Sequence, residues 1–374
     1  MSQESLTHEE ERRHWLDNPG ILSRHERVWR SRQNWLEERG YMLRSRYKPD
    51  WVPSWSGTGK WYNNCVDGPG NPNGLRVIDA TRISDGSFVM LKRVKADNLS
   101  ELEIIRFLSS EPLASDPRNH CTPLLDVLPL PDPQDGVLVV THMLRPLDNP
   151  RFETIGEAVA FFSQIFVVRS SPVHNLLDAV LIVDCTSGNI MMEPVMFPNP
   201  YHPVKIERRR DWKGRTPYYT RTECPPRYFF IDFGLSIRYP SADGPHLELP
   251  IRGGDKTAPE HTGANYMIPC DPFATDIYYL GNLIRETFIQ KCYGFRVIEP
   301  LVADMVQEEP SKRPKIDEVV RRFELIRKSL SWLKLRSRIR KRKEITPVRF
   351  WRACIHIYHN ALYLATRTPA IPDA

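Results

Sequence analysis

The sequence predicts an α+β fold in which a β-rich part precedes a larger helical part. Two strand-like runs, "RVIDATRI" and "SFVMLKRV", are joined by Ser-Asp-Gly and therefore predict a β-hairpin. A helical run, "NLSELEIIRFLSS", a buried strand, "GVLVVTHML", and a longer helical run, "TIGEAVAFFSQIF", follow in that order. With 374 residues, of which 41% are apolar, the chain can form one large domain or a two-lobed one.

An N-terminal helix precedes the hairpin. It is expected to begin at the capping box formed by Ser23 and Glu26 and to end near Gly40, a length of about 16 residues. From residue 47 to residue 74 the composition shifts to Pro, Gly, Asn and Trp, which predicts an irregular arm.

Three short motifs follow in the helical part. "VDCTSGNI" places Asp184 and Asn189 five residues apart, and "FIDFGLS" ends an apolar strand with Asp232 before Phe and Gly. "APE" then ends at Glu260. Each motif is weak alone, but their order after a strand pair that ends in a lysine is much more specific.

In this order the chain resembles a protein kinase from about Val77 to Leu325. The long insertion before "FIDFG" and the form "GGDKTAPE" resemble the fungal-type protein kinase family. The resemblance implies a bilobal protein-kinase-like fold with a β-rich N-lobe and a helical C-lobe. The expected parts are an N-terminal helix and arm at 1–72, a kinase-like domain at 73–327 with lobes at 73–146 and 147–327, and a basic amphipathic tail at 328–374.

This resemblance implies ATP and Mg²⁺ as cofactors and a protein hydroxyl as the substrate. Asp184 is expected to accept the hydroxyl proton, while Asn189 and Asp232 are expected to bind Mg²⁺. Phe233 and Gly234 are expected to pack and hinge the following loop.

The resemblance also assigns a lysine and a glutamate. Lys92, on the second hairpin strand, is expected to pair with the nucleotide phosphates, because an ammonium on a buried strand needs an anion to offset its desolvation. Glu101 is the preferred carboxylate partner for Lys92, since Ile104 and Ile105 then fall on the core side of its helix. Glu103 is the alternative.

Three further residues resemble structural anchors of the kinase large lobe. Glu260 is expected to pair with Arg313, and Asp276 is expected to steady the catalytic loop from within a helix. Other positions depart from the kinase pattern. Ile182 and Val183 stand where His-Arg is usual, and no G-x-G-x-x-G precedes the first strands.

Three functions remain open on these observations: an active protein kinase, a pseudokinase that binds nucleotide or partners, and a small-molecule phosphotransferase. The A-P-E motif and its arginine partner argue against the third. We expect Lys92, Asp184, Asn189 and Asp232 to converge on one cleft. We also expect that cleft to bind Mg-ATP better than it turns it over, because phosphoryl transfer depends on positioning.

The positive charge is concentrated in the tail. Residues 334–352 carry nine Lys or Arg and one Glu, which is +8, so the rest of the chain sums to −2 against a total of +6. Such a cluster suits an anionic partner such as a lipid surface or an import receptor. Arg and Tyr also interleave in the insertion between Asn189 and Asp232, but it is expected to be a surface excursion and no nucleic acid partner is expected.

The tail also predicts an amphipathic helix, because apolar residues recur at spacings of four, three, four and three: Trp351, Ile355, Tyr358, Leu362 and Ala365. We expect this stripe to dock on the large lobe or on the N-terminal helix. Membrane-surface binding is the alternative. Seven cysteines without a C-x-x-C pair, and the lack of a signal peptide or bilayer-spanning run, predict a cytoplasmic or nuclear protein.

Overall fold

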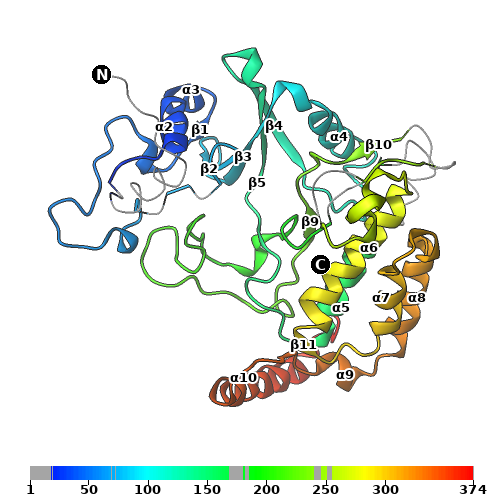
Figure 1. Cartoon of the computed structure of the whole chain (residues 1–374). Helices are drawn as coiled ribbons and strands as arrows, with labels where there is room; N and C mark the ends of the chain where they lie inside the picture. The colour runs from blue at the N-terminus through cyan, green and yellow to red at the C-terminus, as the bar shows by residue number, and fades with distance from the viewer. Residues whose placement is uncertain are drawn as a thin grey trace. The chain divides into compact units, whose positions relative to one another are not determined.

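The computed structural model describes residues 18–373 except 19, 69, 72, 168–179, 182–184, 240–245 and 251–254. Helices and antiparallel strands are both present, so the predicted α+β class is confirmed (Figure 1). The chain forms two compact units that interleave along the sequence. The first unit comprises Met1–Leu99, Leu124–Met143 and Phe197–Pro217, and the second comprises Ser100–Pro123, Leu144–Met196 and Tyr218–Ala374.

A five-stranded antiparallel sheet forms the centre of the first unit, with the order β1-β2-β3-β5-β4. The predicted hairpin is confirmed: Ile78 lies opposite Leu91, and Gly86 adopts a φ of 70° in the turn. Strands β1 and β4 are present in the structure but are not predicted from the sequence. The strands are β1 (Tyr41–Met42), β2 (Val77–Arg82), β3 (Phe88–Val94), β4 (Leu124–Pro129) and β5 (Val137–His142).

The predicted N-terminal helix is two short helices, α2 (Arg24–Ser31) and α3 (Gln33–Glu37). The capping box forms as predicted, since the Glu26 N–H donates to Ser23 Oγ at 3.3 Å and the Ser23 N–H donates to Glu26 Oε2 at 3.0 Å. The expectation of one continuous helix is wrong at Arg32, whose N–H bonds the Trp29 carbonyl at 3.1 Å in a tighter turn.

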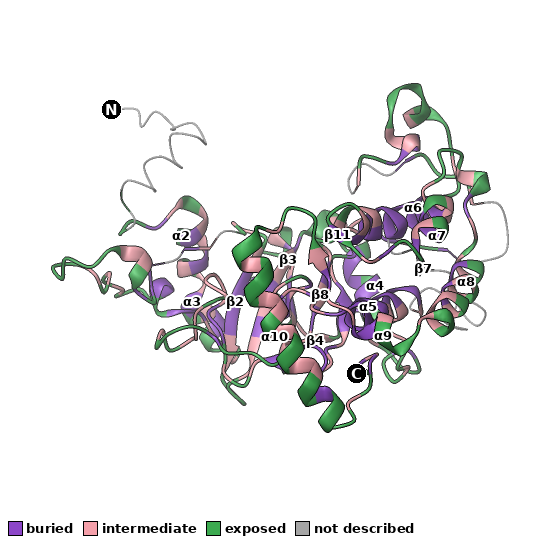
Figure 2. Cartoon of the chain, turned by 90° about the horizontal axis from the view of Figure 1, so that it is seen from below, coloured by how far each residue is buried: buried purple, intermediate pink, exposed green. Residues whose placement is uncertain are grey.

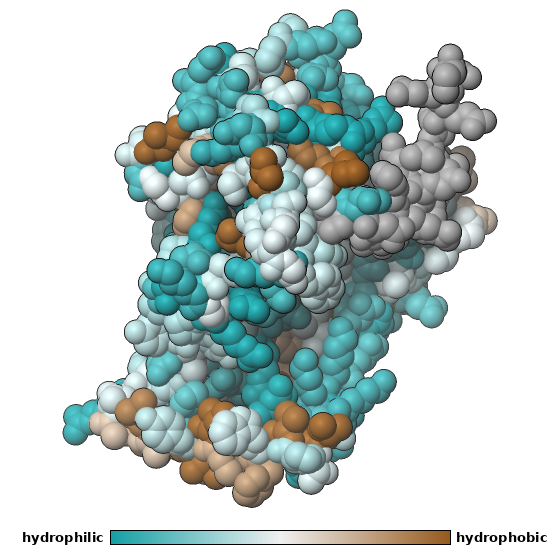
Figure 3. Space-filling view, turned by 90° about the vertical axis from the view of Figure 1, so that its left-hand side faces the viewer, coloured by the Kyte–Doolittle hydropathy of each residue, from teal (hydrophilic) through white to brown (hydrophobic). Residues whose placement is uncertain are grey.

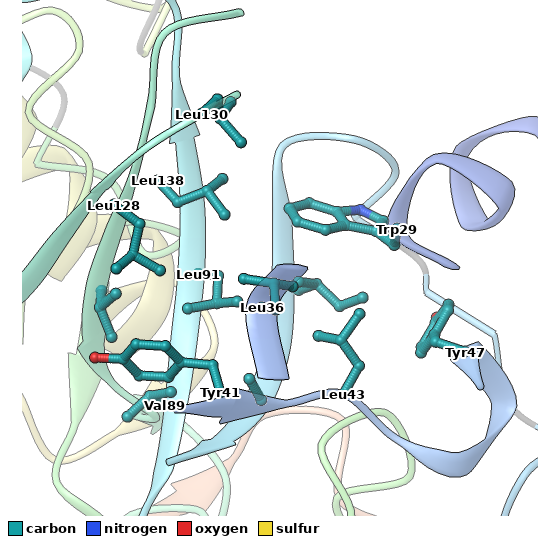
Figure 4. Close-up of a cluster of buried hydrophobic side chains, with 13 residues drawn as sticks. Trp29, Leu36, Tyr41, Leu43, Tyr47, Val89, Leu91, Leu128, Leu130 and Leu138 are labelled. Atoms are coloured by element: carbon teal, nitrogen blue, oxygen red, sulfur yellow. The ribbon is translucent and has the colours of Figure 1, made fainter. Parts of the chain in front are cut away.

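The N-terminal arm packs into the first unit, whereas the sequence analysis places residues 1–72 outside the β-rich lobe. Trp29, Leu36 and Tyr47 are completely buried against apolar side chains of β2, β3 and β5 (Figure 4). These apolar contacts remove large side chains from water and favour one folded body. The first compact unit therefore includes the arm.

Part of the long insertion also belongs to the first unit. Arg210 donates to Thr81 Oγ1 at 3.4 Å, and the Trp212 indole N–H donates to the Asn64 carbonyl at 2.7 Å. His202 is buried and contacts the Val66 carbonyl at 3.1 Å. The insertion is thus more than a surface excursion, because its side chains bond to the arm and to the sheet.

The second unit is mainly helical and has an aromatic core. Ring centroids lie 4.7 Å apart for Phe161 and Tyr228, and 4.9 Å apart for Phe162 and Phe288. A small antiparallel sheet, β6-β8-β9, lies beside helix α5. The main helices are α4 (Ser100–Leu108), α5 (Ile155–Val167), α6 (Pro272–Ile284), α7 (Glu299–Met305), α8 (Ile316–Ser329), α9 (Trp332–Arg336) and α10 (Thr346–Ala365). The strands are β6 (Arg145–Pro146), β7 (Val180–Leu181), β8 (Ile190–Met192), β9 (Tyr228–Phe230), β10 (Ile237–Arg238), β11 (Cys292–Tyr293) and β12 (Arg340–Lys341).

Helix α10 forms in the tail where it is predicted, and it docks on the second unit. The Tyr363 side chain is buried, and its hydroxyl lies 2.6 Å from the Thr220 hydroxyl. His359 Nδ1 lies 3.2 Å from Glu153 Oε2. The tail helix therefore docks on its own chain, within the second unit, as expected for a tail that packs on the helical part.

The face that docks is not the predicted one. The predicted stripe includes Trp351 and Tyr358, and both of these side chains are 67% exposed. The surface beneath α10 offers carboxylate and hydroxyl groups, so the polar face of the helix turns toward it and forms hydrogen bonds there.

A buried carboxylate fixes the start of α10. The Glu344 side chain is 2% exposed and accepts hydrogen bonds from Arg338 and Arg352, both at 2.8 Å. Arg151 lies 3.7 Å away. Burial acts to raise the pKa of Glu344, but the two arginine hydrogen bonds outweigh it and lower the pKa from 4.5 to about 2.

We expect Glu344→Gln to lower the free energy of unfolding by about 1–3 kcal/mol at neutral pH, because it removes the negative charge that accepts hydrogen bonds from Arg338 and Arg352. A carboxylate with a lowered pKa stabilises the fold above pH 4.5 and loses this effect as the pH falls toward 2. Urea unfolding at neutral and acidic pH measures the difference. Glu308→Gln, at an exposed carboxylate, is the control. An equal effect of both substitutions at neutral pH would contradict the prediction.

Candidate functional site

The β8-β9 pair brings two predicted site residues to the same end of a small sheet. Ile190 lies opposite Phe230, and the Ile231 N–H donates to the Asn189 carbonyl at 2.9 Å. Asp232 follows Ile231 directly. Asn189 and Asp232, 43 positions apart in the chain by their residue numbers, therefore lie at neighbouring backbone positions.

Strand β9 is supported on its other edge by a segment that the sequence analysis does not single out. The Phe230 N–H donates to the His120 carbonyl at 2.7 Å, and the Thr122 N–H donates to the Phe230 carbonyl at 3.0 Å. His120 Nδ1 lies 2.8 Å from the Tyr228 carbonyl. Burial lowers the pKa of His120 to about 4, so this imidazole is neutral at physiological pH. Hydrogen bonds on both edges thus fix the end of β9.

Asp232 has an unusual backbone conformation. Its φ is 66°, in the left-handed region that few residues other than glycine adopt. The next side chain, Phe233, is buried as predicted, whereas Asp232 is exposed. The Gly234 N–H donates to Asp232 Oδ1 at 3.2 Å. Such conformations persist where the surroundings impose them, and they cluster at functional sites.

The predicted pair of Glu260 and Arg313 is present. It is bidentate, with Nη1 to Oε1 at 2.7 Å and Nη2 to Oε2 at 2.8 Å, and both side chains are buried. The Thr275 hydroxyl donates to Glu260 Oε1 at 2.6 Å. Burial acts to raise the pKa of Glu260, but the bonds from Arg313 and Thr275 outweigh it and lower the pKa. This carboxylate is therefore ionised and ties the "APE" motif to the rest of the second unit.

A second link joins the "APE" region to helix α6, and it is not predicted from the sequence. The Thr257 hydroxyl donates to Asp255 Oδ1 at 2.7 Å, and the Asn282 amide donates to Thr257 Oγ1 at 3.0 Å. The Asn282 amide also donates to Asp255, and Asn282 is itself buried. The "DKT" stretch carries no local signal for this contact, because its partner lies in a distant helix.

The structure places the other predicted residues on separate elements. Asp276 is buried on α6. Lys92 lies half-buried on β3 of the first unit, opposite Val139 on β5. Glu101 is buried in the first turn of α4, in the second unit. The pairing of Lys92 with Glu101 stays a prediction.

Asp184, Ile182 and Val183 lie outside the described residues. The convergence of Asp184 with the other predicted site residues therefore stays a prediction as well.

The side-chain oxygens of Asp232 and Asn189, at the end of β9, suit a magnesium ion as ligands. Among the described residues, no group of three or more His, Cys, Asp or Glu side chains could hold a metal ion. Magnesium, however, is commonly bound by one or two protein oxygens together with substrate phosphates and water. The Asp232 carboxylate and the Asn189 amide oxygen fit that pattern, because the ladder places their backbones side by side.

No protein-family model matches the chain, and no curated protein matches it.

Proposed function

We propose that this chain is a protein phosphotransferase of the bilobal protein-kinase-like type, dependent on ATP and Mg²⁺. The carrying observation is the end of β9, where the ladder sets Asn189 beside Asp232 and Asp232 adopts a strained conformation. Phe233 is anchored in the core immediately after it. This arrangement presents an exposed carboxylate from a rigid support, which is what metal-assisted phosphoryl transfer requires of the protein.

Each proposed residue has one task. Bound Mg²⁺ neutralises charge that develops on the transferred phosphoryl group. Asp232 and Asn189 would hold the ion, and the fixed strand end limits how far their backbones move. Lys92 pairs with the phosphates and Glu101 orients Lys92. The Lys92 ammonium is a point charge that complements an anion.

Asp184 accepts the proton of the substrate hydroxyl. The hydroxyl oxygen forms a bond to the γ-phosphorus as the bond from that phosphorus to the bridging oxygen breaks, and ADP leaves with the electron pair. The proton therefore ends on the Asp184 carboxylate, and the phosphoryl group ends on the substrate.

The ion pair of Glu260 with Arg313 favours a protein substrate over a small molecule. It anchors the "APE" motif on the large lobe. This anchor follows the Asp-Phe-Gly motif in the kinase pattern, and its presence argues against a small-molecule phosphotransferase. Ile182 and Val183, in place of His-Arg, favour slow turnover. The pseudokinase alternative uses the same site for binding without transfer.

The seven cysteines, all described and free of disulfides, fit the reducing cytosol or nucleus.

The proposal predicts a rise in melting temperature with Mg-ATP, because a ligand that binds only the native state stabilises it. At a ligand concentration of about 100 Kd the stabilisation is about 2.7 kcal/mol. Asp232→Asn is expected to remove the Mg²⁺-dependent part of this rise. Asparagine tolerates a left-handed φ, so the substitution removes the charge and keeps the backbone. Thermal shift with ATP, in Mg²⁺ or in EDTA, measures the effect.

Two further variants separate binding from turnover. Asp184→Asn is expected to bind Mg-ATP like the parent and to lose phosphate transfer from labelled ATP. Asp317→Asn, at an exposed acid on α8, is the matched control and should bind like the parent. Binding by the parent without any transfer would select the pseudokinase. An Asp232→Asn variant that binds Mg-ATP as well as the parent would refute the proposed site.

A further inference from the structure

The exposed side of α10 is mostly apolar. Phe350, Trp351 and Tyr358 are 72%, 67% and 67% exposed, and Ile357 and Leu364 are exposed beside them. Figure 2 shows much of α10 as exposed, and Figure 3 shows hydrophobic side chains gathered along its bottom edge, where Figure 1 places α10. The three aromatic side chains alone present roughly 400 Å². This is the size of the largest patch on a typical monomer, and such patches are often functional.

The patch is not an unfinished interface with the chain's own core. Its opposite face is already engaged, through Tyr363 with Thr220, His359 with Glu153, and the Asn360 amide with the Arg336 carbonyl. The apolar side is therefore left for a partner outside the second unit.

Acidic residues are absent from this segment. From residue 345 to residue 372 the sequence contains no Asp or Glu. The preceding carboxylate, Glu344, is buried and engaged by Arg338 and Arg352. Lys343 and Arg349 are exposed close to the start of the helix. The partner should therefore combine apolar character with negative charge.

A basic cavity lies close to the start of α10. It has a volume of about 630 Å³, and its wall includes Arg151, Lys291, Lys341, Arg342 and Lys343, with a single acid, Asp148. Lys343 precedes the first residue of α10 by three positions. A concave site with five cations and one carboxylate favours an anionic group such as a phosphate.

We propose that the second unit binds the anionic surface of a lipid bilayer, independently of the proposed enzymatic function. The apolar face of α10 enters the boundary between head groups and acyl chains, and a head-group phosphate occupies the basic cavity. An amphipathic helix with aromatic residues on one side and cations beside it has this property. None of the described helices is long and apolar enough to span a bilayer, so α10 lies in the plane of the interface.

A second copy of the chain is a poorer partner for this face. Pairing two α10 helices would bring their cations together and supply no acid between residues 345 and 372 to neutralise them. Like charges that face one another oppose association. The bilayer satisfies the apolar and the cationic groups together.

Co-sedimentation with vesicles tests the proposal on the full chain. We expect binding to vesicles of phosphatidylcholine with roughly one third phosphatidylserine, and little binding to phosphatidylcholine alone. The triple variant Phe350→Ser, Trp351→Ser, Tyr358→Ser should weaken binding at least about tenfold, because it removes the inserted side chains. The double variant Lys291→Ser, Lys343→Ser should weaken it about fivefold for each lysine.

Matched controls remove similar groups elsewhere on the second unit. Met267→Ser with Ile268→Ser removes exposed apolar side chains, and Lys256→Ser with Lys328→Ser removes two exposed lysines. Both controls should bind vesicles like the parent. No binding by the parent to anionic vesicles would overturn the proposal. The proposal would also be overturned if the parent were a dimer in sedimentation velocity, the triple variant were a monomer, and both bound vesicles equally.

Discussion

Replacement of Arg46 by methionine is expected to lower the free energy of unfolding of the first unit by about 3–5 kcal/mol. The Arg46 side chain is 0% exposed and its partner Glu26 is 1% exposed, with Nε 2.6 Å from Oε1. The guanidinium also donates to the carbonyls of Asp67 and Gly68 at 3.1 and 3.3 Å. The substitution therefore leaves a buried carboxylate without its cation and removes the guanidinium donor of two carbonyls.

Urea unfolding followed by tryptophan fluorescence measures this loss, since Trp51 lies against the Arg46 guanidinium. The double variant Arg46→Met, Glu26→Gln should recover part of the stability, because it removes the uncompensated charge. Glutamine also keeps the capping box with Ser23. The control is Arg39→Met, at an exposed pair with Glu38, with an expected change below about 1 kcal/mol. Equal effects of Arg46→Met and Arg39→Met would show that the buried pair contributes nothing special.

Arg313→Met is the second substitution with a large expected effect, again about 3–5 kcal/mol, now in the second unit. Besides the bidentate pair with Glu260, the guanidinium donates to the carbonyls of Gln307 and Ala274 at 2.8 and 3.0 Å. Three separate stretches of the second unit thus meet at one side chain. Its loss should also increase hydrogen exchange in the segment that contains Glu260, because that carboxylate then lies buried without its cation.

Thermal and urea unfolding give the stability change, and peptide-resolved hydrogen exchange gives the local one. Arg327→Met is the matched control, because Arg327 pairs with Glu324 at 2.7 Å on the surface of α8. Glu260→Gln combined with Arg313→Met should be more stable than Arg313→Met alone. A loss of stability without any change in exchange near Glu260 would contradict the proposed anchoring.

The sequence predicts those elements whose signal is local. Strands β3 and β5 contain apolar runs, a Ser-Asp-Gly turn joins β2 to β3, and the capping box at Ser23 is complete within four residues. Strand β1 has only two residues, and β4 contains Asp126 and ends at Pro129, which weaken a strand pattern. The Tyr41 hydroxyl donates to Asp126 at 2.9 Å, a contact between distant stretches that no periodicity reveals.

The tail shows the limit of a pattern argument. The spacing from Trp351 to Ala365 correctly predicts a helix, but an apolar stripe does not say that its own chain covers it. What decides the docked face is the position of Glu153 and Thr220, which come from distant parts of the sequence. The candidate site behaves in the same way. Motif order singles out Asn189 and Asp232, while the ladder that joins them and the support from His120 require the fold.

The interleaving of the two units has a consequence for synthesis on the ribosome. Arg210 reaches Thr81 and Asp79 from the third stretch of the first unit, so this unit is incomplete until about residue 217 has left the exit tunnel. At about 5–20 residues per second, translation from residue 99, where the first stretch of this unit ends, to residue 217 takes roughly 6–24 s. During that time the growing chain holds strands and buried charges that lack their last partner, and segments of the second unit are already present. The first unit therefore finishes folding only after two of the three stretches of the second have been made, although its first stretch precedes them.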